Sequence, residues 1–188
     1  MGRFDLRPLF RGQFKSLKLA NRSDRPYDIA AIGILYGVPL VLLGLSFKLD
    51  WYLSAPVPIL TAVSLLAGGT LSAFSSLSSL RLKLTEWSDS HDGKDVYRDS
   101  LDESVAHLFM VALACVVDAA VLVVGLNVSR GEPGAPRAEA VVGVPAFFAI
   151  AITAYVFLAF VMVLPRLYWA YTRMNRVSPR LDGFDATR

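Results

Sequence analysis

Two long stretches of the 188-residue chain contain no Asp, Glu, Lys or Arg, and they constrain its fold more than any other feature. They are Ile29–Phe47, with 19 residues, and Trp51–Leu80, with 30 residues. Two further stretches are nearly as bare, since Val105–Val128 contains one acid and Ala140–Leu164 contains no charged residue. An apolar window of about 18 residues or more with few charges is typical of a membrane-spanning helix. The sequence therefore predicts an all-α integral membrane protein with four transmembrane helices.

The composition excludes several other classes of protein. Apolar residues make up 54% of the chain and charged residues only 19%, whereas a soluble domain carries about a quarter charged residues. This deficit, concentrated in four stretches, excludes an ordinary soluble domain and a disordered chain. Cys115 is the single cysteine, so a scaffold held by intrachain disulfides is excluded as well.

The polar segments divide the chain into a basic lead, a membrane domain with a central hairpin, and a tail. Pro56 and Pro58 suit the first turn of the second helix, because proline lacks the N–H that a helix interior needs. For the same reason we expect Pro165 to end the fourth. The predicted segments are residues 1–28, 29–165 and 166–188, with the hairpin at 81–104. The predicted spans are about 29–47, 57–80, 105–127 and 140–164.

The distribution of Lys and Arg predicts the orientation of the spans. Sixteen of the 19 basic residues lie in the lead, the central hairpin and the tail. The other two connections contain only Lys48, Arg130 and Arg137. Positively charged residues near span ends remain on the cytoplasmic side of a membrane. We therefore expect both termini and the hairpin to be cytoplasmic, with two short loops outside.

Asp118 is the only charged residue within the predicted spans. It follows Val105 by 13 residues, which places it near the bilayer midplane. A carboxylate at this depth costs about 2.5–3.5 kcal/mol on insertion scales, and such residues face a bundle interior, an interface or water. Asp118 can be protonated, hydrogen-bonded to a Ser or Thr of a neighbouring helix, or hydrated in a pore. A structural hydrogen bond and a role in ion passage, proton coupling or gating are both open.

Small and hydroxyl-bearing residues recur on one face of the second predicted span. Their spacing of three or four residues places them in a stripe, where helices can approach closely and hydroxyls can hydrogen-bond across. Counting equal depths from the span ends places Ala67, Gly68, Gly69 and Thr70 near Asp118. We interpret the stripe as a packing seam or as the lining of a pore in an oligomer. Its members are Ser64, Gly68, Ser72, Ser75 and Ser79.

The lead carries basic residues at steps of three and four, with apolar residues of the same period on another face. This pattern predicts a basic amphipathic helix on the cytoplasmic membrane surface, where anionic headgroups attract each basic residue by about 1 kcal/mol. The alternative is a site for a phosphate-bearing ligand, such as a nucleotide or oligonucleotide, held through its backbone charge. The basic positions are Arg3, Arg7, Arg11, Lys15, Lys18 and Arg22, and the apolar ones are Leu6, Phe10, Phe14 and Leu17.

The central hairpin contains an acidic cluster, Asp89, His91, Asp92 and Asp95. It lacks the ordered ligand positions and final Glu of a calcium loop, and it lacks the Cys or second His of a zinc site. We interpret it as a solvated turn able to pair with the basic lead. The chain has no nucleophile–base pair, phosphate loop or cofactor motif, so we expect no bound metal, no cofactor and no enzymatic activity.

The order of segments resembles that of a known group of proteins. A basic lead, a first span, a tight outer turn and a long second span with the small-residue run Ile59–Leu80 are followed by a cytosolic hairpin. This arrangement is similar to that of small four-span bacterial proteins of phage-defence systems, including membrane effectors of Hailong- and Kiwa-type systems. The resemblance covers architecture along most of the chain and transfers no site residue. It implies an inner-membrane protein that oligomerises and perturbs the membrane, or senses membrane stress, usually with a cytosolic partner.

These observations favour an oligomeric effector that forms a pore or disrupts the bacterial inner membrane under cytosolic control. Asp118 and the stripe from Ser64 to Ser79 would line or close the path. Two alternatives are open. One is a small dimeric proton-coupled transporter in which Asp118 alternates between a proton and substrate. The other is a non-conducting membrane anchor for a cytosolic regulatory protein.

Overall fold

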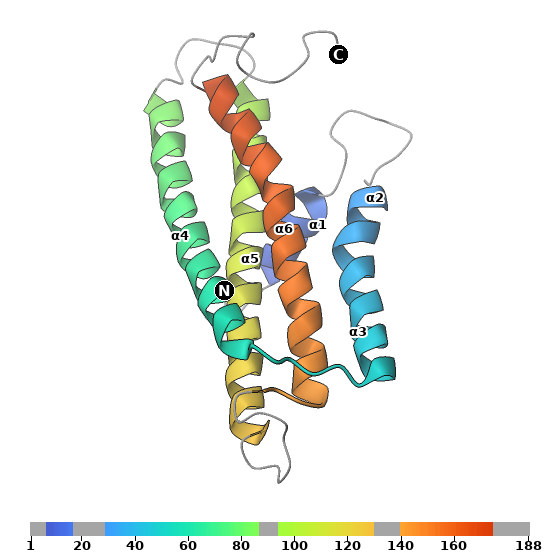
Figure 1. The fold of residues 1–188 in the computed structure, drawn as a ribbon. Helices are drawn as coiled ribbons and strands as arrows, with labels where there is room; N and C mark the ends of the chain where they lie inside the picture. The colour runs from blue at the N-terminus through green and yellow to red at the C-terminus, as the bar shows by residue number, and fades with distance from the viewer. Residues whose placement is uncertain (1–6, 17–28, 87–93, 130–139, 175–188) are drawn as a thin grey trace.

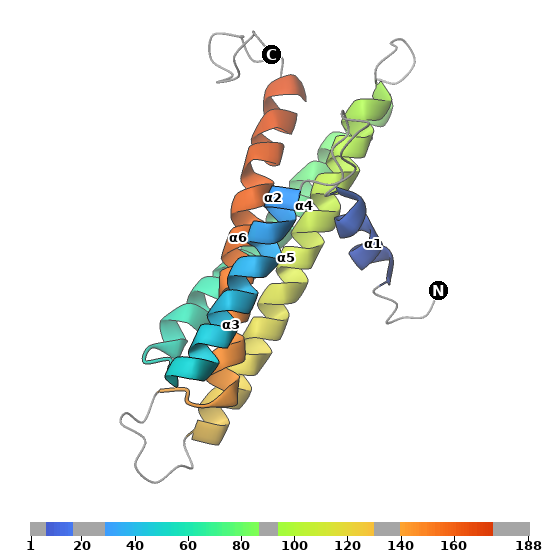
Figure 2. The ribbon, with the colours of Figure 1, turned by 90° about the vertical axis from the view of Figure 1, so that its right-hand side faces the viewer.

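The computed structural model describes residues 7–16, 29–86, 94–129 and 140–174, which are helical apart from short connections (Figures 1 and 2). Four helical segments are long and apolar enough to cross a membrane. The predicted all-α fold with four helices of spanning length is confirmed. The observed spans are Ile29–Leu49, Pro56–Ser79, Ser104–Ser129 and Val144–Pro165.

Two antiparallel helices, α5 (Lys94–Ser129) and α6 (Val144–Met174), form the centre of the bundle. Helix α4 (Pro56–Glu86) packs against α5, and α3 (Val38–Leu49) packs against α6 on the other side (Figure 1). A short helix, α1 (Arg7–Ser16), packs against α5 (Figure 2). This arrangement leaves α4 and the first span at opposite edges, each with a face turned away from the other helices.

The first span is not the uninterrupted α-helix that its composition predicts. It consists of α2 (Ile29–Ile32), a π-helical turn η1 (Gly33–Gly37) and α3. Pro39 lies in the first turn of α3 and has no N–H to donate to the carbonyl four residues earlier. A π-turn is a common way for a helix to accommodate a local break in its hydrogen-bond ladder.

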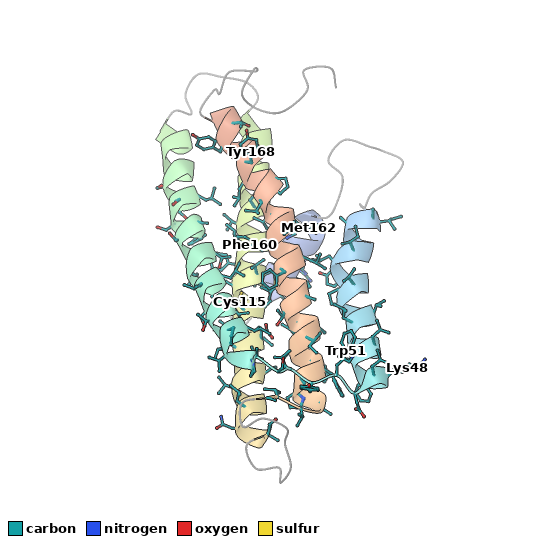
Figure 3. The ribbon with its side chains drawn as sticks, viewed as in Figure 1. Lys48, Trp51, Cys115, Phe160, Met162 and Tyr168 are labelled. Atoms are coloured by element: carbon teal, nitrogen blue, oxygen red, sulfur yellow. The ribbon has the colours of Figure 1, made fainter. Side chains whose placement is uncertain are left out.

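The two short connections at one end of the bundle are joined by a single antiparallel β-bridge. Leu53 N–H donates to the Val141 carbonyl over 2.9 Å, and Val141 N–H donates back over 3.0 Å. Asp50 ends α3 in the left-handed conformation, with φ 48°. Helix α4 begins at Pro56, as its sequence predicts. Trp51 and Lys48 lie at this end of the molecule (Figure 3).

The fourth span ends at Pro165, close to its predicted end, but its helix differs from the prediction at both ends. Helix α6 begins at Val144 instead of position 140, because Val141 is held in the β-bridge and Gly143 adopts φ 69°. At the other end the helix continues through Pro165 to Met174. One proline removes one hydrogen bond and need only kink a long packed helix, so Pro165 marks the end of the apolar span without ending the helix.

The core draws residues from all four spans. Leu35, Val63, Val111 and Val156 are each completely buried and belong to one contiguous apolar cluster. Each comes from a different span, so the cluster ties the four helices together. Cys115, labelled in Figure 3, belongs to the same cluster and lies on the inner side of α5.

Candidate functional site

The inner face of α5 forms a regular seam, and Asp118 is part of it. Its buried residues alternate at steps of four and three, the heptad spacing by which two helices interlock side chains along their length. We call this set the α5 seam. Its members are Ser104, Leu108, Val111, Cys115, Asp118, Leu122, Gly125 and Ser129.

Asp118 is completely buried, with 0% of its surface exposed. The Thr153 hydroxyl of α6 donates a hydrogen bond to Asp118 Oδ2 over 2.7 Å. The other carboxyl oxygen, Oδ1, is buried and has no hydrogen-bond partner among the described residues. A buried polar atom without a partner is unusual in a protein, so this half of the carboxyl group is the most distinctive polar feature of the bundle.

Thr153 was missed from the sequence, which placed the neighbours of Asp118 on the second span. The predicted hydrogen-bond partner on the second span was therefore wrong. Thr70 is buried, but its hydroxyl donates to the Ala67 carbonyl of its own helix over 2.8 Å. The signal for Thr153 was available, because Asp118 lies 11 residues before Ser129 and Thr153 lies nine residues after Val144. The two residues therefore lie at similar depths from the same end of antiparallel neighbours.

The predicted stripe on α4 lies on its outer face. Ser64, Gly68, Gly69, Ser72, Ser75 and Ser79 are exposed, and of the predicted set only Thr70 is buried. The inner face of α4 consists of Val63, Thr70 and Leu77 at intervals of seven residues. At 3.6 residues per turn these two sets point in nearly opposite directions. The stripe is therefore not a packing seam within one chain, and it does not adjoin Asp118. We call it the α4 outer face.

Hydroxyls on the α4 outer face are bonded to their own helix. The Ser64 hydroxyl donates to the Leu60 carbonyl over 2.8 Å, and the Ser79 hydroxyl donates to the Ser76 carbonyl over 2.7 Å. A Cβ atom added at Gly68 or Gly69 would find no atom within 4 Å. The face is thus narrow, with hydroxyl oxygens that still have lone pairs to accept bonds and room for close approach by another helix or by water.

Helix α1 is seated against the membrane domain. A Cβ atom added at Gly12 would come within 3.0 Å of Ala106 Cβ on α5, so glycine permits this close approach. Arg7, Phe10 and Arg11 are exposed on the other side. Among the remaining predicted basic positions, Arg3, Lys18 and Arg22 lie outside the described residues, and the Lys15 side chain is not described.

Gln13 anchors α1 to the spans through a buried polar contact. Its side chain is 1% exposed, and its Nε2 donates to the Tyr155 hydroxyl of α6 over 2.8 Å. The Tyr155 ring lies 5.8 Å from the ring of Tyr36 in η1. The contact thus links α1, α6 and the π-turn of the first span. Sequence reasoning missed Gln13 because the basic and apolar periods of the lead drew attention to other positions.

The structure describes only one residue of the predicted acidic cluster of the hairpin. Asp89, His91 and Asp92 lie outside the described residues, and Asp95 is in the first turn of α5. Within the described ranges, no group of three or more His, Cys, Asp or Glu is arranged to hold a metal ion. The strongest candidate site in the described part of the chain is therefore the Asp118–Thr153 pair, followed by the α4 outer face and the Gln13–Tyr155 contact.

Comparison of the chain with protein-family models, curated protein sequences and solved structures gave no match.

Proposed function

We propose that the protein assembles with copies of itself in the bacterial inner membrane, with both termini cytoplasmic, and that the α4 outer face lines a path across the bilayer. The observation that carries this proposal is the exposure of Ser64, Gly68, Ser72, Ser75 and Ser79 along one side of α4. Small and hydroxyl-bearing residues on the outer side of an edge helix differ from the large apolar residues expected on a helix that only contacts lipid.

The other outward surfaces of the bundle support this distinction. Leu40 and Val41 on α3 are 65% and 61% exposed, and Val116 on α5 is 62% exposed. Such large apolar side chains suit contact with acyl chains. The outward side of α4 carries one of them, Leu65, which is 72% exposed beside the small residues. Small residues instead let helix backbones approach closely in a membrane, and hydroxyl oxygens accept hydrogen bonds from water. The α4 outer face therefore fits helix–helix contact in a closed assembly and water contact in an open one.

The matching experiment measures assembly and conductance on the same variants. Gly68→Leu places a large side chain in the middle of the face, and Ser72→Leu does so one turn later. We expect both to lower the oligomeric mass of the purified protein in lipid nanodiscs and to reduce its conductance in planar bilayers. Gly44→Leu on α3 is the matched control, because a Cβ added there also meets no atom within 4 Å.

The outcomes separate cleanly. A monomeric wild-type protein, or conductance that is indifferent to Gly68→Leu and Ser72→Leu, would reject the proposal. Loss of assembly with Gly44→Leu alone would assign the contact between copies to α3 instead. In cells, the same two α4 variants should reduce any depolarisation caused by expression of the wild-type chain, as measured with a potential-sensitive dye.

A second function, a non-conducting membrane anchor or sensor for a cytosolic protein, is favoured by the seating of α1. Its exposed residues Arg7, Phe10 and Arg11 form one side of a helix whose opposite side is held by Gln13. A docked helix with an exposed basic side could transmit binding of an anionic lipid or partner to the spans. Stable co-purification of a cytosolic protein, lost with Arg11→Glu, together with no conductance in bilayers, would support this function over the first.

A further inference from the structure

Asp118 has an arrangement that an ionised carboxylate could not easily maintain. The group is completely buried near mid-depth of the span, and one hydroxyl, Thr153 Oγ1, reaches one of its two oxygens. The second oxygen, Oδ1, is buried and meets no hydrogen-bond partner in the described part of the chain. A buried charge is retained in a protein when it is paired and hydrogen-bonded, and among the described residues this carboxyl has one hydrogen bond and no opposite charge beside it.

The elements packed around the site offer few titratable groups. On α5, Cys115 lies one turn away, and His107 lies three turns nearer the hairpin end. Tyr155 on α6 and Tyr36 in η1 pack against the cluster that contains Cys115. The span of α4 contains no titratable residue, and α1 directs Gln13 toward Tyr155. Lys48, the one Lys or Arg of the first span, is exposed at the far end of α3.

A neutral carboxyl accounts for the geometry. With the proton on Oδ2, the 2.7 Å contact becomes a bond donated by the carboxyl to Thr153 Oγ1, since a protonated acid carries one donor. The unpartnered Oδ1 is then an uncharged carbonyl oxygen. Removal of the proton to water would leave a negative charge on a group that has one donor, so water would have to enter the α5 seam to supply the others.

We propose that Asp118 and Thr153 form a proton-binding site between α5 and α6, and that its proton is released only when water enters the α5 seam. The ligand is a proton, and its release is coupled to opening of the packed centre of the bundle. The proposed function depends on contacts at the α4 outer face and requires none at this site. The two proposals can therefore fail independently.

Infrared spectroscopy tests the resident proton directly. The protein is reconstituted in lipid vesicles with isotope-labelled aspartate, and the carbonyl stretching band of a protonated carboxyl is recorded at neutral pH. Every other Asp of the chain lies outside the four spans, so substitution assigns the band to Asp118 or to the residues outside. We expect a protonated band that is lost in Asp118→Asn and retained in Asp50→Asn, the same change at the exposed turn after α3. Absence of the band from the wild type would overturn the proposal.

The single cysteine tests the coupling to water entry. Cys115 is 1% exposed and lies one turn from Asp118, so its reaction with a water-soluble thiol reagent reports opening of the α5 seam. Raising the pH increases thiol reactivity in any protein, and Asp118→Asn provides the baseline for that effect. We expect the wild type to show a several-fold larger increase than Asp118→Asn, over the same pH range in which the infrared band disappears.

Each alternative result has a defined meaning. Equal pH responses of Cys115 in the two proteins would overturn the coupling. A carboxylate band at neutral pH that shifts when Na⁺ replaces a large organic cation would show a cation site and overturn the proton site. If Asp118→Asn does not fold, Thr153→Val provides the second variant. It should keep the protonated band but shift its frequency upward through loss of the hydrogen bond, and an unchanged band would contradict the pairing.

Discussion

The α5 seam and the α4 outer face both carry polar groups within the membrane span, yet the chain buries one and exposes the other. The seam holds a carboxyl group that has 0% exposure and a partner on another helix. The outer face holds hydroxyls that donate to carbonyls of their own helix. A hydroxyl satisfied locally can therefore remain on an edge, whereas a carboxyl needs shielding from lipid by neighbouring helices.

This difference has a consequence for how the two regions contribute to stability. Lipid tails are as apolar as Leu, so burying an apolar side chain between spans gains little from the hydrophobic effect. Stability depends instead on close packing and on hydrogen bonds between helices. Matched substitutions in the seam and on outward surfaces should consequently differ strongly in their effect on the free energy of unfolding. The size of each difference tests the comparison between the two regions.

The largest difference is expected for leucine truncation. Leu122→Ala in the α5 seam removes a completely buried side chain, while Leu65→Ala removes one that is 72% exposed on α4. We expect Leu122→Ala to lower the free energy of unfolding by about 2–3 kcal/mol through the cavity it leaves, and Leu65→Ala to change it little. Titration with a denaturing detergent in mixed micelles, followed by tryptophan fluorescence, measures both. Similar losses would show that Leu65 is buried in a contact between copies, as the proposed assembly through the α4 outer face allows.

The second contrast uses glycine. A Cβ added at Gly125 would lie 2.6 Å from Val141 Cγ1 and 3.0 Å from Pro145 Cβ, whereas one added at Gly68 meets nothing within 4 Å. Overpacking should make Gly125→Ala less stable by about 1–3 kcal/mol. Gly68→Ala should leave the monomer's unfolding free energy unchanged or slightly raised, since alanine favours a helix. A stable Gly125→Ala protein would mean that the Leu53–Val141 bridge shifts easily.

The sequence was sufficient for the four spans and insufficient for their local geometry. Runs with at most one charged residue predicted all four, because a bilayer requires about 20 apolar residues per helix. The break at Gly33–Gly37 was missed because composition does not report hydrogen-bond register. The start of α6 was misplaced because the β-bridge of Val141 depends on Leu53, about 90 residues earlier in the chain.

The candidate site shows the same limit. Asp118 was predictable as a buried acid from its depth alone, but its partner depended on which neighbouring span its side chain meets. The α4 and α6 spans both pack against α5, and each carries a hydroxyl at that depth. The carboxyl of Asp118 meets Thr153 of α6, whereas the Thr70 hydroxyl of α4 bonds to its own helix. The role of Gln13 could not be predicted for a similar reason, because its partner Tyr155 lies 142 residues away in the sequence.

The third contrast compares hydroxyl groups. Thr153→Val keeps the shape of the side chain but removes the hydrogen bond to Asp118, while Ser64→Ala removes one that lies within α4. Hydrogen bonds between spans contribute about 0.6 kcal/mol on average and up to about 1.7 kcal/mol. We expect Thr153→Val to lose about 1 kcal/mol and Ser64→Ala to lose almost nothing, by the same detergent titration. Equal effects would remove the distinction between a bond that joins helices and one that does not.

The smallest effect on global unfolding is expected at α1, where the contact joins a peripheral helix to the spans. Gln13→Ala removes the 2.8 Å bond to Tyr155, and Arg11→Ala changes an exposed neighbour. A lost hydrogen bond of about 1 kcal/mol would raise the undocked population of α1 about fivefold while the four spans remain packed. Amide hydrogen exchange in α1 should therefore accelerate in Gln13→Ala and not in Arg11→Ala, with no change in α5. Faster exchange in α5 as well would show that α1 supports the α5 seam, and the polar contact of Gln13 would then belong with the seam instead of with the periphery.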